Sequence, residues 1–194
     1  MTLKHTPWGP AQHATTSAPG IVFYSTASHG GYHLSPERQR ALLAKFNDFT
    51  PFAGAPWYEE DQDCAVVVLA FPDLFEADKL RGAVHTARYS AKPSNFGLSQ
   101  RYPGWESVVA WLDSPAGATI LRRVAEWEAE HANDWEYAGG STICPGYPVG
   151  CWNQRLIRIA DGLEKCVVLQ PKHPYQHIWT DADITQYAAL PVAG

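Results

Sequence analysis

The most apolar run of the chain is the segment Cys64-Ala-Val-Val-Val-Leu-Ala-Phe71. It is rich in β-branched residues, it is too short to span a membrane, and Pro72 follows it directly. Runs of this length and composition are typical of a strand that is covered on both faces. We therefore predict a central β-strand over residues 64–71, with the other elements of a domain layered around it.

Hydrophobic spacing and capping residues on either side of this run predict further helices and strands. Ser35 precedes Pro36 at one predicted helix start, and Asp73 stands three residues before Glu76 in the pattern of a capping box at another. The predicted helices cover residues 36–48, 73–89, 115–131 and 180–189, the predicted strands residues 21–26, 32–34, 64–71, 151–160 and 165–170, and an exposed loop residues 91–101. The pattern predicts an α+β fold: a single layered domain with a central, mostly antiparallel sheet packed by three to four helices.

Chain length and composition are those of one packed domain. The chain has 194 residues, of which 45% are hydrophobic and 12% aromatic, and disordered chains are poor in such residues. Residues 1–20 are rich in Pro, Thr, Ala and His without any period. We therefore predict an N-terminal arm over residues 1–20, anchored by Trp8, and a single α+β domain over residues 21–194.

Charge and composition argue against several classes of function. The formal net charge of −5 disfavours direct binding of nucleic acid. No charged leader precedes an apolar stretch, and no run reaches the roughly 18 apolar residues of a membrane span, so we expect a cytoplasmic protein without membrane contact. The four cysteines lack the paired spacing of a zinc finger or ribbon. We predict no cofactor and leave open whether a metal binds.

Two polar segments carry most of the candidate chemistry. The first is Ser28-His29-Gly30-Gly31 with the nearby His33, in which the glycines bend the chain and can expose backbone amides to an anion. The two imidazoles are suited to act as bases or as metal ligands. Alternatively, His29 closes a turn and His33 bonds to a backbone carbonyl. A hydroxyl of this region activated by His29 is a further alternative, although no G-x-S-x-G elbow presents it.

The second polar segment is Glu59-Glu60-Asp61-Gln62-Asp63, which follows Trp57 and Tyr58 directly. Its carboxylates would complete a site with the two imidazoles if the segments meet in the fold. A solvated turn is the alternative interpretation. The catalytic candidates are His29, His33, Glu59 and Glu60, and the binding candidates are Ser28, Gly30, Gly31, Trp57, Tyr58 and Asp61.

A third segment, residues 127–137, alternates acidic with aromatic side chains. Such a surface is suited to a basic partner protein, because aromatic residues are enriched where proteins bind each other. The alternative is a helix end whose tryptophans pack inward while its carboxylates face water.

Several motifs of the first 80 residues resemble a known family. They are Thr6-Pro-Trp-Gly-Pro-Ala11, Pro19-Gly-Ile21, Ser25-Thr26 with Ser28-His-Gly-Gly31, Leu34-Ser-Pro-Glu-Arg38, Trp57-Tyr-Glu-Glu-Asp61 and Ala70-Phe-Pro-Asp-Leu-Phe75. On these motifs the chain is similar to a proteobacterial domain of unknown function that is carried on plasmids, prophages and other mobile elements. The resemblance implies no reaction and no catalytic residues, but it implies a setting in which a small protein acts on host defence or maintains the element.

Two functions are expected from these observations. The first is a non-enzymatic interaction protein of a mobile element that inhibits a host defence complex by binding a protein partner. The second is a small hydrolase or transferase that acts on a nucleotide-like substrate through a histidine and carboxylate site. Whether the protein is an enzyme therefore stays open at the level of the sequence.

Overall fold

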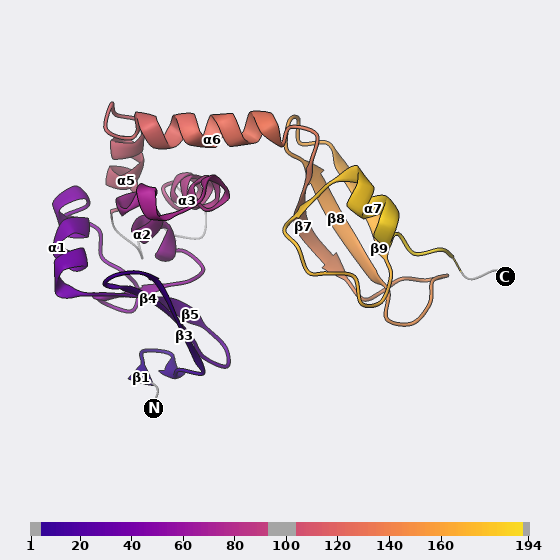
Figure 1. The fold of residues 1–194 in the computed structure, drawn as a ribbon, viewed down its shortest axis with the longest axis horizontal. Coiled ribbons are helices and arrows are strands. Elements are labelled where there is room, and N and C mark those ends of the chain that lie inside the picture. The colour runs from indigo at the N-terminus through magenta and orange to yellow at the C-terminus, as the bar shows by residue number, and fades with distance from the viewer. Residues whose placement is uncertain (1–4, 93–103, 192–194) are drawn as a thin grey trace. The chain divides into compact units, whose positions relative to one another are not determined.

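The computed structural model of the chain describes residues 5–92 and 104–191. Its contacts group into two compact units, residues 1–124 (unit 1) and residues 125–194 (unit 2). Both units combine helices with antiparallel strand pairs, which confirms the predicted α+β class (Figure 1). This grouping differs from the expected arm over residues 1–20 and single domain over residues 21–194, because residues 1–20 belong to unit 1 and the C-terminal sheet has a core of its own.

Unit 1 contains a four-stranded sheet in the order β3-β4-β5-β6, as far as the described residues show. Its strands are β3 (His13–Ala18), β4 (Ile21–Ser25), β5 (Gly30–Leu34) and β6 (Trp57–Glu59), and a small hairpin of β1 (His5–Thr6) and β2 (Gly9–Pro10) precedes them. Side chains alternate between the two faces of a strand. Ile21, Leu34 and Tyr58 point into the core and are at most 1% exposed, so the opposite face of the sheet carries Tyr24, His33 and Trp57.

The helices of unit 1 cover the core face of this sheet (Figure 1). They are α1 (Pro36–Lys45), α2 (Cys64–Ala70), the 3₁₀ turn η1 (Pro72–Leu74), α3 (Ala77–Ser90), α5 (Trp105–Leu112) and α6 (Ala118–Glu130), the last of which continues into unit 2. Ser35 caps α1 as predicted, because its hydroxyl accepts a hydrogen bond from the amide of Arg38. No described helix has both the length and the apolar character that crossing a membrane requires.

The predicted central strand over residues 64–71 is wrong, because Cys64–Ala70 forms helix α2. All six residues from Ala65 to Ala70 are buried, and α2 contacts β5, β6, α1 and α3. A helix that is enclosed on every side is apolar all round, so its sequence lacks the helical period that would identify it. The small helix penalty of β-branched residues is outweighed by their burial.

Other predicted boundaries also shift. The first helix ends at Lys45 rather than near Asp48, and the second begins at Ala77 because residues 72–74 form the 3₁₀ turn. Most of the predicted loop over residues 91–101 lies outside the described residues.

Residues 5–20 are not an irregular arm, because His13–Ala18 forms strand β3 and pairs with β4. Trp8 anchors this segment, as expected, by lying over Gly31 of β5. A Cβ atom at Gly31 would clash with the indole of Trp8 and with the backbone carbonyl oxygen of Tyr58. Trp8 also contacts Trp57 edge to face, with ring centroids 5.8 Å apart. The absence of a side chain at Gly31 therefore makes room for the aromatic anchor.

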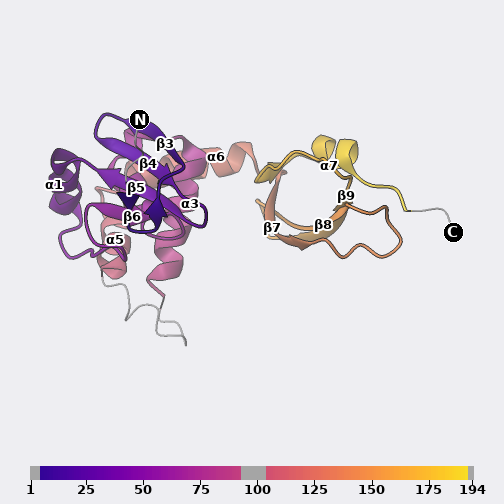
Figure 2. The ribbon, with the colours of Figure 1, turned by 90° about the horizontal axis from the view of Figure 1, so that it is seen from below.

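Unit 2 is a four-stranded antiparallel sheet in the order β10-β7-β8-β9 with one helix, counted over the described residues. The elements are β7 (Trp135–Ser141), β8 (Trp152–Arg158), β9 (Glu164–Leu169), β10 (Ile178–Trp179) and α7 (Asp181–Tyr187). Figure 2 shows α7 lying across one face of the sheet. Between that face and the helix lies a small core of Trp135, Leu156, Leu169, Trp179 and Ile184. The predicted hairpin turn at Asp161-Gly162 is confirmed by the pairing of β8 with β9.

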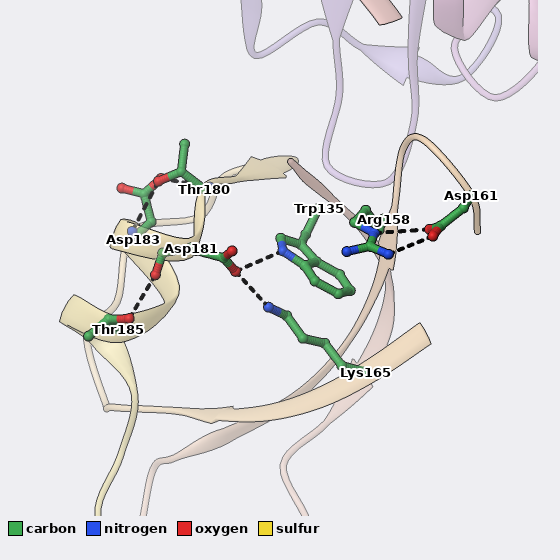
Figure 3. Close-up of polar contacts among 8 residues, drawn as sticks. All are labelled: Trp135, Arg158, Asp161, Lys165, Thr180, Asp181, Asp183 and Thr185. Atoms are coloured by element: carbon green, nitrogen blue, oxygen red, sulfur yellow. Dashed lines mark hydrogen bonds and ion pairs between the residues drawn. The ribbon is translucent and has the colours of Figure 1, made fainter. Parts of the chain in front are cut away.

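A polar network ties α7 to the sheet of unit 2 (Figure 3). The Oδ1 atom of Asp181 accepts hydrogen bonds from Nε1 of Trp135 at 2.9 Å and from Nζ of Lys165 at 3.0 Å. The hydrogen bond from Lys165 lowers the pKa of Asp181 the most, and the one from Trp135 lowers it further. Thr180 and Asp183 complete the predicted cap of α7 by exchanging side-chain and backbone hydrogen bonds.

The contact of Trp8 with Gly31 can be tested by Gly31→Ala. We expect this substitution to lower the free energy of unfolding by about 1–3 kcal/mol, because the carbonyl of Tyr58 belongs to the sheet and cannot rotate away. The matched control is Gly82→Ala on the exposed side of α3, where a Cβ meets nothing within 4 Å, and it should raise stability by about 0.5–1 kcal/mol. Urea unfolding measures both, and a Gly31→Ala protein as stable as the parent would contradict the packing.

Candidate functional site

His29, Glu59 and Asp61 come together where β5 begins and β6 ends. The register of the two strands pairs Gly31 with Glu59, which brings the carboxylate beside the turn that carries His29. Nδ1 of His29 lies 3.7 Å from Oε1 of Glu59. Within the described part of the chain, these three residues form a group whose candidate ligand atoms all lie within 4.8 Å of one another. The two polar segments thus meet, as expected from the sequence.

This group lines an open cleft of about 320 Å³. Its lining also includes Trp8, Phe52, Gln62 and Asp63. The side chain of His29 is 50% exposed and that of Glu59 only 12%, so the imidazole stands at the mouth and the carboxylate in the wall. We name this set of His29, Glu59, Asp61 and Asp63 the cleft cluster.

Burial alters the acidity of two carboxyl groups in the cleft cluster. It raises the pKa of Glu59, although the amide of Asp61 donates to Glu59 Oε2 at 2.9 Å and opposes the shift. It raises the pKa of Asp63 to about 6, against a hydrogen bond of 2.7 Å from the amide of Phe52 to Oδ2. Acidic groups so close together favour a cation in the cleft, because each destabilises the ionised form of its neighbour.

Two predicted catalytic residues do not join the cleft cluster. His33 lies further along β5, opposite Trp57, and its ring packs against the indole with centroids 4.5 Å apart. Glu60 lies on the other face of the sheet from Trp8, because its Oε2 would be 2.6 Å from a Cβ at Gly30, whereas Trp8 covers the adjacent Gly31. Strand alternation thus separates Glu59 from Glu60, and the turn before β5 separates His29 from His33.

Of the predicted binding residues, one lines the cleft and the others lie elsewhere. Only Asp61 lines the cleft, and Ser28 is exposed in the turn before β5. Gly30 and Gly31 are buried in β5 rather than open to an anion. Trp57 belongs to the aromatic group on the outer face of the sheet. Tyr58 is 0% exposed, and its hydroxyl donates to Oε1 of Gln39 at 3.0 Å, so it is a core residue.

Four cleft residues were absent from the predicted site: Trp8, Phe52, Gln62 and Asp63. Asp63 belongs to the acidic segment of residues 59–63, so the sequence indicated that it lies near the site. The sequence did not indicate that its side chain is buried. Trp8 was expected only as an anchor. No pattern in the sequence indicates that Phe52 lies at the cleft. Its amide donates a hydrogen bond to Oδ2 of Asp63, eleven residues further along the chain, and this contact holds it there.

The acidic and aromatic segment over residues 127–137 does not present its aromatic rings on one surface. Trp135 is 6% exposed in the core of unit 2. Trp127 stacks on the imidazole of His131 with ring centroids 4.1 Å apart. Of its two tryptophans, Trp135 therefore packs inward as in the alternative interpretation, whereas Trp127 is half-buried against His131.

The pKa of Asp63 predicts a pH-dependent stability. Its rise from 3.8 to about 6 means that the folded protein binds this proton more tightly than the unfolded chain. Stability should therefore fall as the pH rises from about 4 to 6, by about 2–3 kcal/mol for this group. Asp63→Asn keeps an acceptor for Phe52 and should remove that part of the slope in urea unfolding. The exposed control Asp78→Asn should retain the pH dependence of the parent protein. Equal pH dependence of the unfolding free energy in all three proteins would contradict the raised pKa of Asp63.

Comparison with known proteins places unit 1 in a family. The family described as "Domain of unknown function (DUF7007)" matches residues 2–132, a range that contains the whole cleft cluster and ends shortly before β7. No curated protein and no solved structure matches the chain. Because the match covers well over half of the sequence, the chain belongs to this family of domains of unknown function, DUF7007.

Proposed function

We propose that unit 1 is a small metal-dependent hydrolase or transferase that acts on a nucleotide-like substrate. The observation that supports this proposal is the convergence of His29, Glu59 and Asp61 at the mouth of an open cleft. One imidazole and two carboxylates are sufficient to hold a divalent cation while leaving positions for water and substrate.

The ligand set favours a first-row transition metal such as Mn²⁺ or Zn²⁺. Imidazole nitrogen combined with carboxylate oxygen suits these ions better than Ca²⁺, which takes oxygen ligands. A cation in this position would lower the pKa of a bound water and make it a nucleophile near neutral pH. Asp63 lines the same cleft with a pKa of about 6, which suits a general base that accepts the proton of that water.

The walls of the cleft suit a nucleotide. Trp8 and Phe52 offer aromatic faces for a base, and the cation would bind phosphate oxygens that the acidic cleft would otherwise repel. The substrate would therefore place its base against the aromatic wall and its phosphate against the metal.

The proposal predicts a metal site that can be mapped with Mn²⁺. Electron paramagnetic resonance of free Mn²⁺ should show binding to the parent protein, and Glu59→Gln, Asp61→Asn and His29→Ala should each weaken it at least about tenfold, because even outer-shell changes cost that much. Glu60→Gln is the matched control, since it removes a neighbouring carboxylate from the other face of the sheet. Hydrolysis of a nucleotide panel should follow the same order. Equal Mn²⁺ affinity of Glu59→Gln and Glu60→Gln would refute the site.

A second candidate function is that of an interaction protein, and strand β3 supports it. This strand forms one edge of the unit 1 sheet, and its residues 13–17 are exposed. The segment contains neither proline nor lysine, which are common devices against strand addition. An extended segment of a partner would extend the sheet here through backbone hydrogen bonds. The resemblance to proteins of mobile elements suggests a host defence complex as the partner to be inhibited.

The interaction hypothesis predicts that a partner depends on β3 and not on the cleft. In co-purification from a host strain, the double variant Thr15→Lys and Thr16→Lys should lose a stoichiometric partner, because edge lysines oppose strand addition. The cleft variant His29→Ala should retain the same partner. Retention by the lysine variant, or loss confined to His29→Ala, would count against binding at this edge.

A further inference from the structure

Unit 2 contains a cleft of about 270 Å³ that is independent of the cleft cluster in unit 1. Strands β7 and β8 form one side of it, and residues 173–176 together with Trp179 form the other. Its volume lies just below the about 300–1,000 Å³ of ordinary small-molecule sites, so a single ring system is the size of ligand that fits.

Four of the eight described residues that line this cleft have large aromatic side chains. They are Tyr137, Trp152, Tyr175 and Trp179. Tyr137 and Tyr175 meet edge to face with ring centroids 6.4 Å apart. Trp152 lies over Gly140, where any Cβ would clash with the indole. Tyr175 is 87% exposed, so a ligand in the cleft would cover an aromatic face that now meets water.

Two amide groups in this wall have an Nε2 atom without a hydrogen-bond partner, those of Gln154 and Gln176. Gln154 is the more deeply buried residue, at only 3% exposed. Two other polar groups of the wall have partners: Nε1 of Trp179 donates to the carbonyl of Gln176 at 2.9 Å, and Nδ1 of His173 lies 2.9 Å from the carbonyl of Gln170. Buried polar groups are almost always hydrogen-bonded. The amide of Gln154 is therefore placed to bond to a ligand in the cleft.

The lack of charged side chains in the described lining of this cleft indicates what class of ligand it suits. Among the described residues that line the cleft, there is no Asp, Glu, Lys or Arg. Residues 125–194 carry nine acidic against four basic side chains, which disfavours a phosphate. A cation cage would be stabilised by a carboxylate in the wall, and a quaternary ammonium ion could not bond to Gln154. An uncharged planar ring with hydrogen-bonding groups on its edge satisfies all of these conditions.

We propose that this cleft of unit 2 binds a nucleobase, stacked on the aromatic wall and hydrogen-bonded at its edge by the amide of Gln154. An amide presents a donor beside an acceptor, and the N6 and N7 atoms of adenine present the complementary pair, which glutamine recognises with two hydrogen bonds. The base enters as a free nucleoside or as part of a single strand, since both present the same edge and the same faces.

Titration of the full chain with adenosine, followed by calorimetry, tests the proposal. Adenosine should bind, and AMP should bind no more tightly, because the described lining of the cleft includes neither lysine nor arginine and Nδ1 of the lining His173 already lies 2.9 Å from the carbonyl of Gln170. Gln154→Met has nearly the same shape and should reduce adenosine affinity at least tenfold while leaving the melting temperature unchanged or higher, because it removes a buried donor without a partner. Tyr175→Ala should also weaken binding, whereas Ile143→Ala, at an equally exposed apolar site of unit 2, should not.

The remaining outcomes distinguish a free nucleoside from a single strand as the source of the base, and a nucleobase from a quaternary ammonium ion as the ligand. Binding of an oligo-dA strand at least tenfold tighter than adenosine would support base recognition with a single strand as the source, provided that Gln154→Met abolishes it. Binding of choline in place of adenosine would overturn the proposal in favour of a cation cage. Unchanged adenosine affinity in Gln154→Met, or no binding of adenosine by the parent protein, would overturn it as well.

Discussion

The antiparallel pairing of β5 with β6 is the interaction on which unit 1 depends. It sets Gly31 opposite Glu59 and Tyr32 opposite Tyr58, and thereby decides which side chains enter the core and which face outward. A shift of one residue would exchange the two faces. Tyr58 would then leave the core, and Glu59 would be carried away from His29. The cleft cluster is therefore a consequence of strand register as much as of the residues that compose it.

Burial reinforces this pairing from both sides of the sheet. On one face, α2 contacts β5 and β6, and its six buried residues supply apolar area that offsets the entropy of ordering the chain. On the other face, Trp8 closes over Gly31. The cleft cluster lies at the end of this doubly covered strand pair, where packing stops and carboxyl groups meet solvent. Within the cluster His29 stands half exposed, whereas Asp63 is only 2% exposed, and this burial makes its carboxyl group hard to ionise.

The two units present different chemistry. Unit 1 gathers an imidazole and carboxyl groups in an open cleft, an arrangement that suits a cation. Unit 2 gathers aromatic rings around an uncharged amide, an arrangement that suits a neutral ring. The family match covers unit 1 and stops near the beginning of unit 2. All described residues that line the cleft of unit 2 thus lie beyond the part of the chain that the family model matches.

Features that depend on near neighbours in the chain could be predicted from the sequence. Ser35 and Thr180 cap helices because a hydroxyl can reach amides within the next turn, and Asp161-Gly162 forms a hairpin because these residues favour its backbone. The class of fold also followed from pattern. Long-range packing determines that residues 64–70 are a helix, that the two polar segments meet through the register of β5 with β6, that Glu60 and His33 leave the site, and that Phe52 and Gln154 line clefts. Those outcomes depend on burial and strand register, which are set by residues far apart in the chain and leave no local periodic signal.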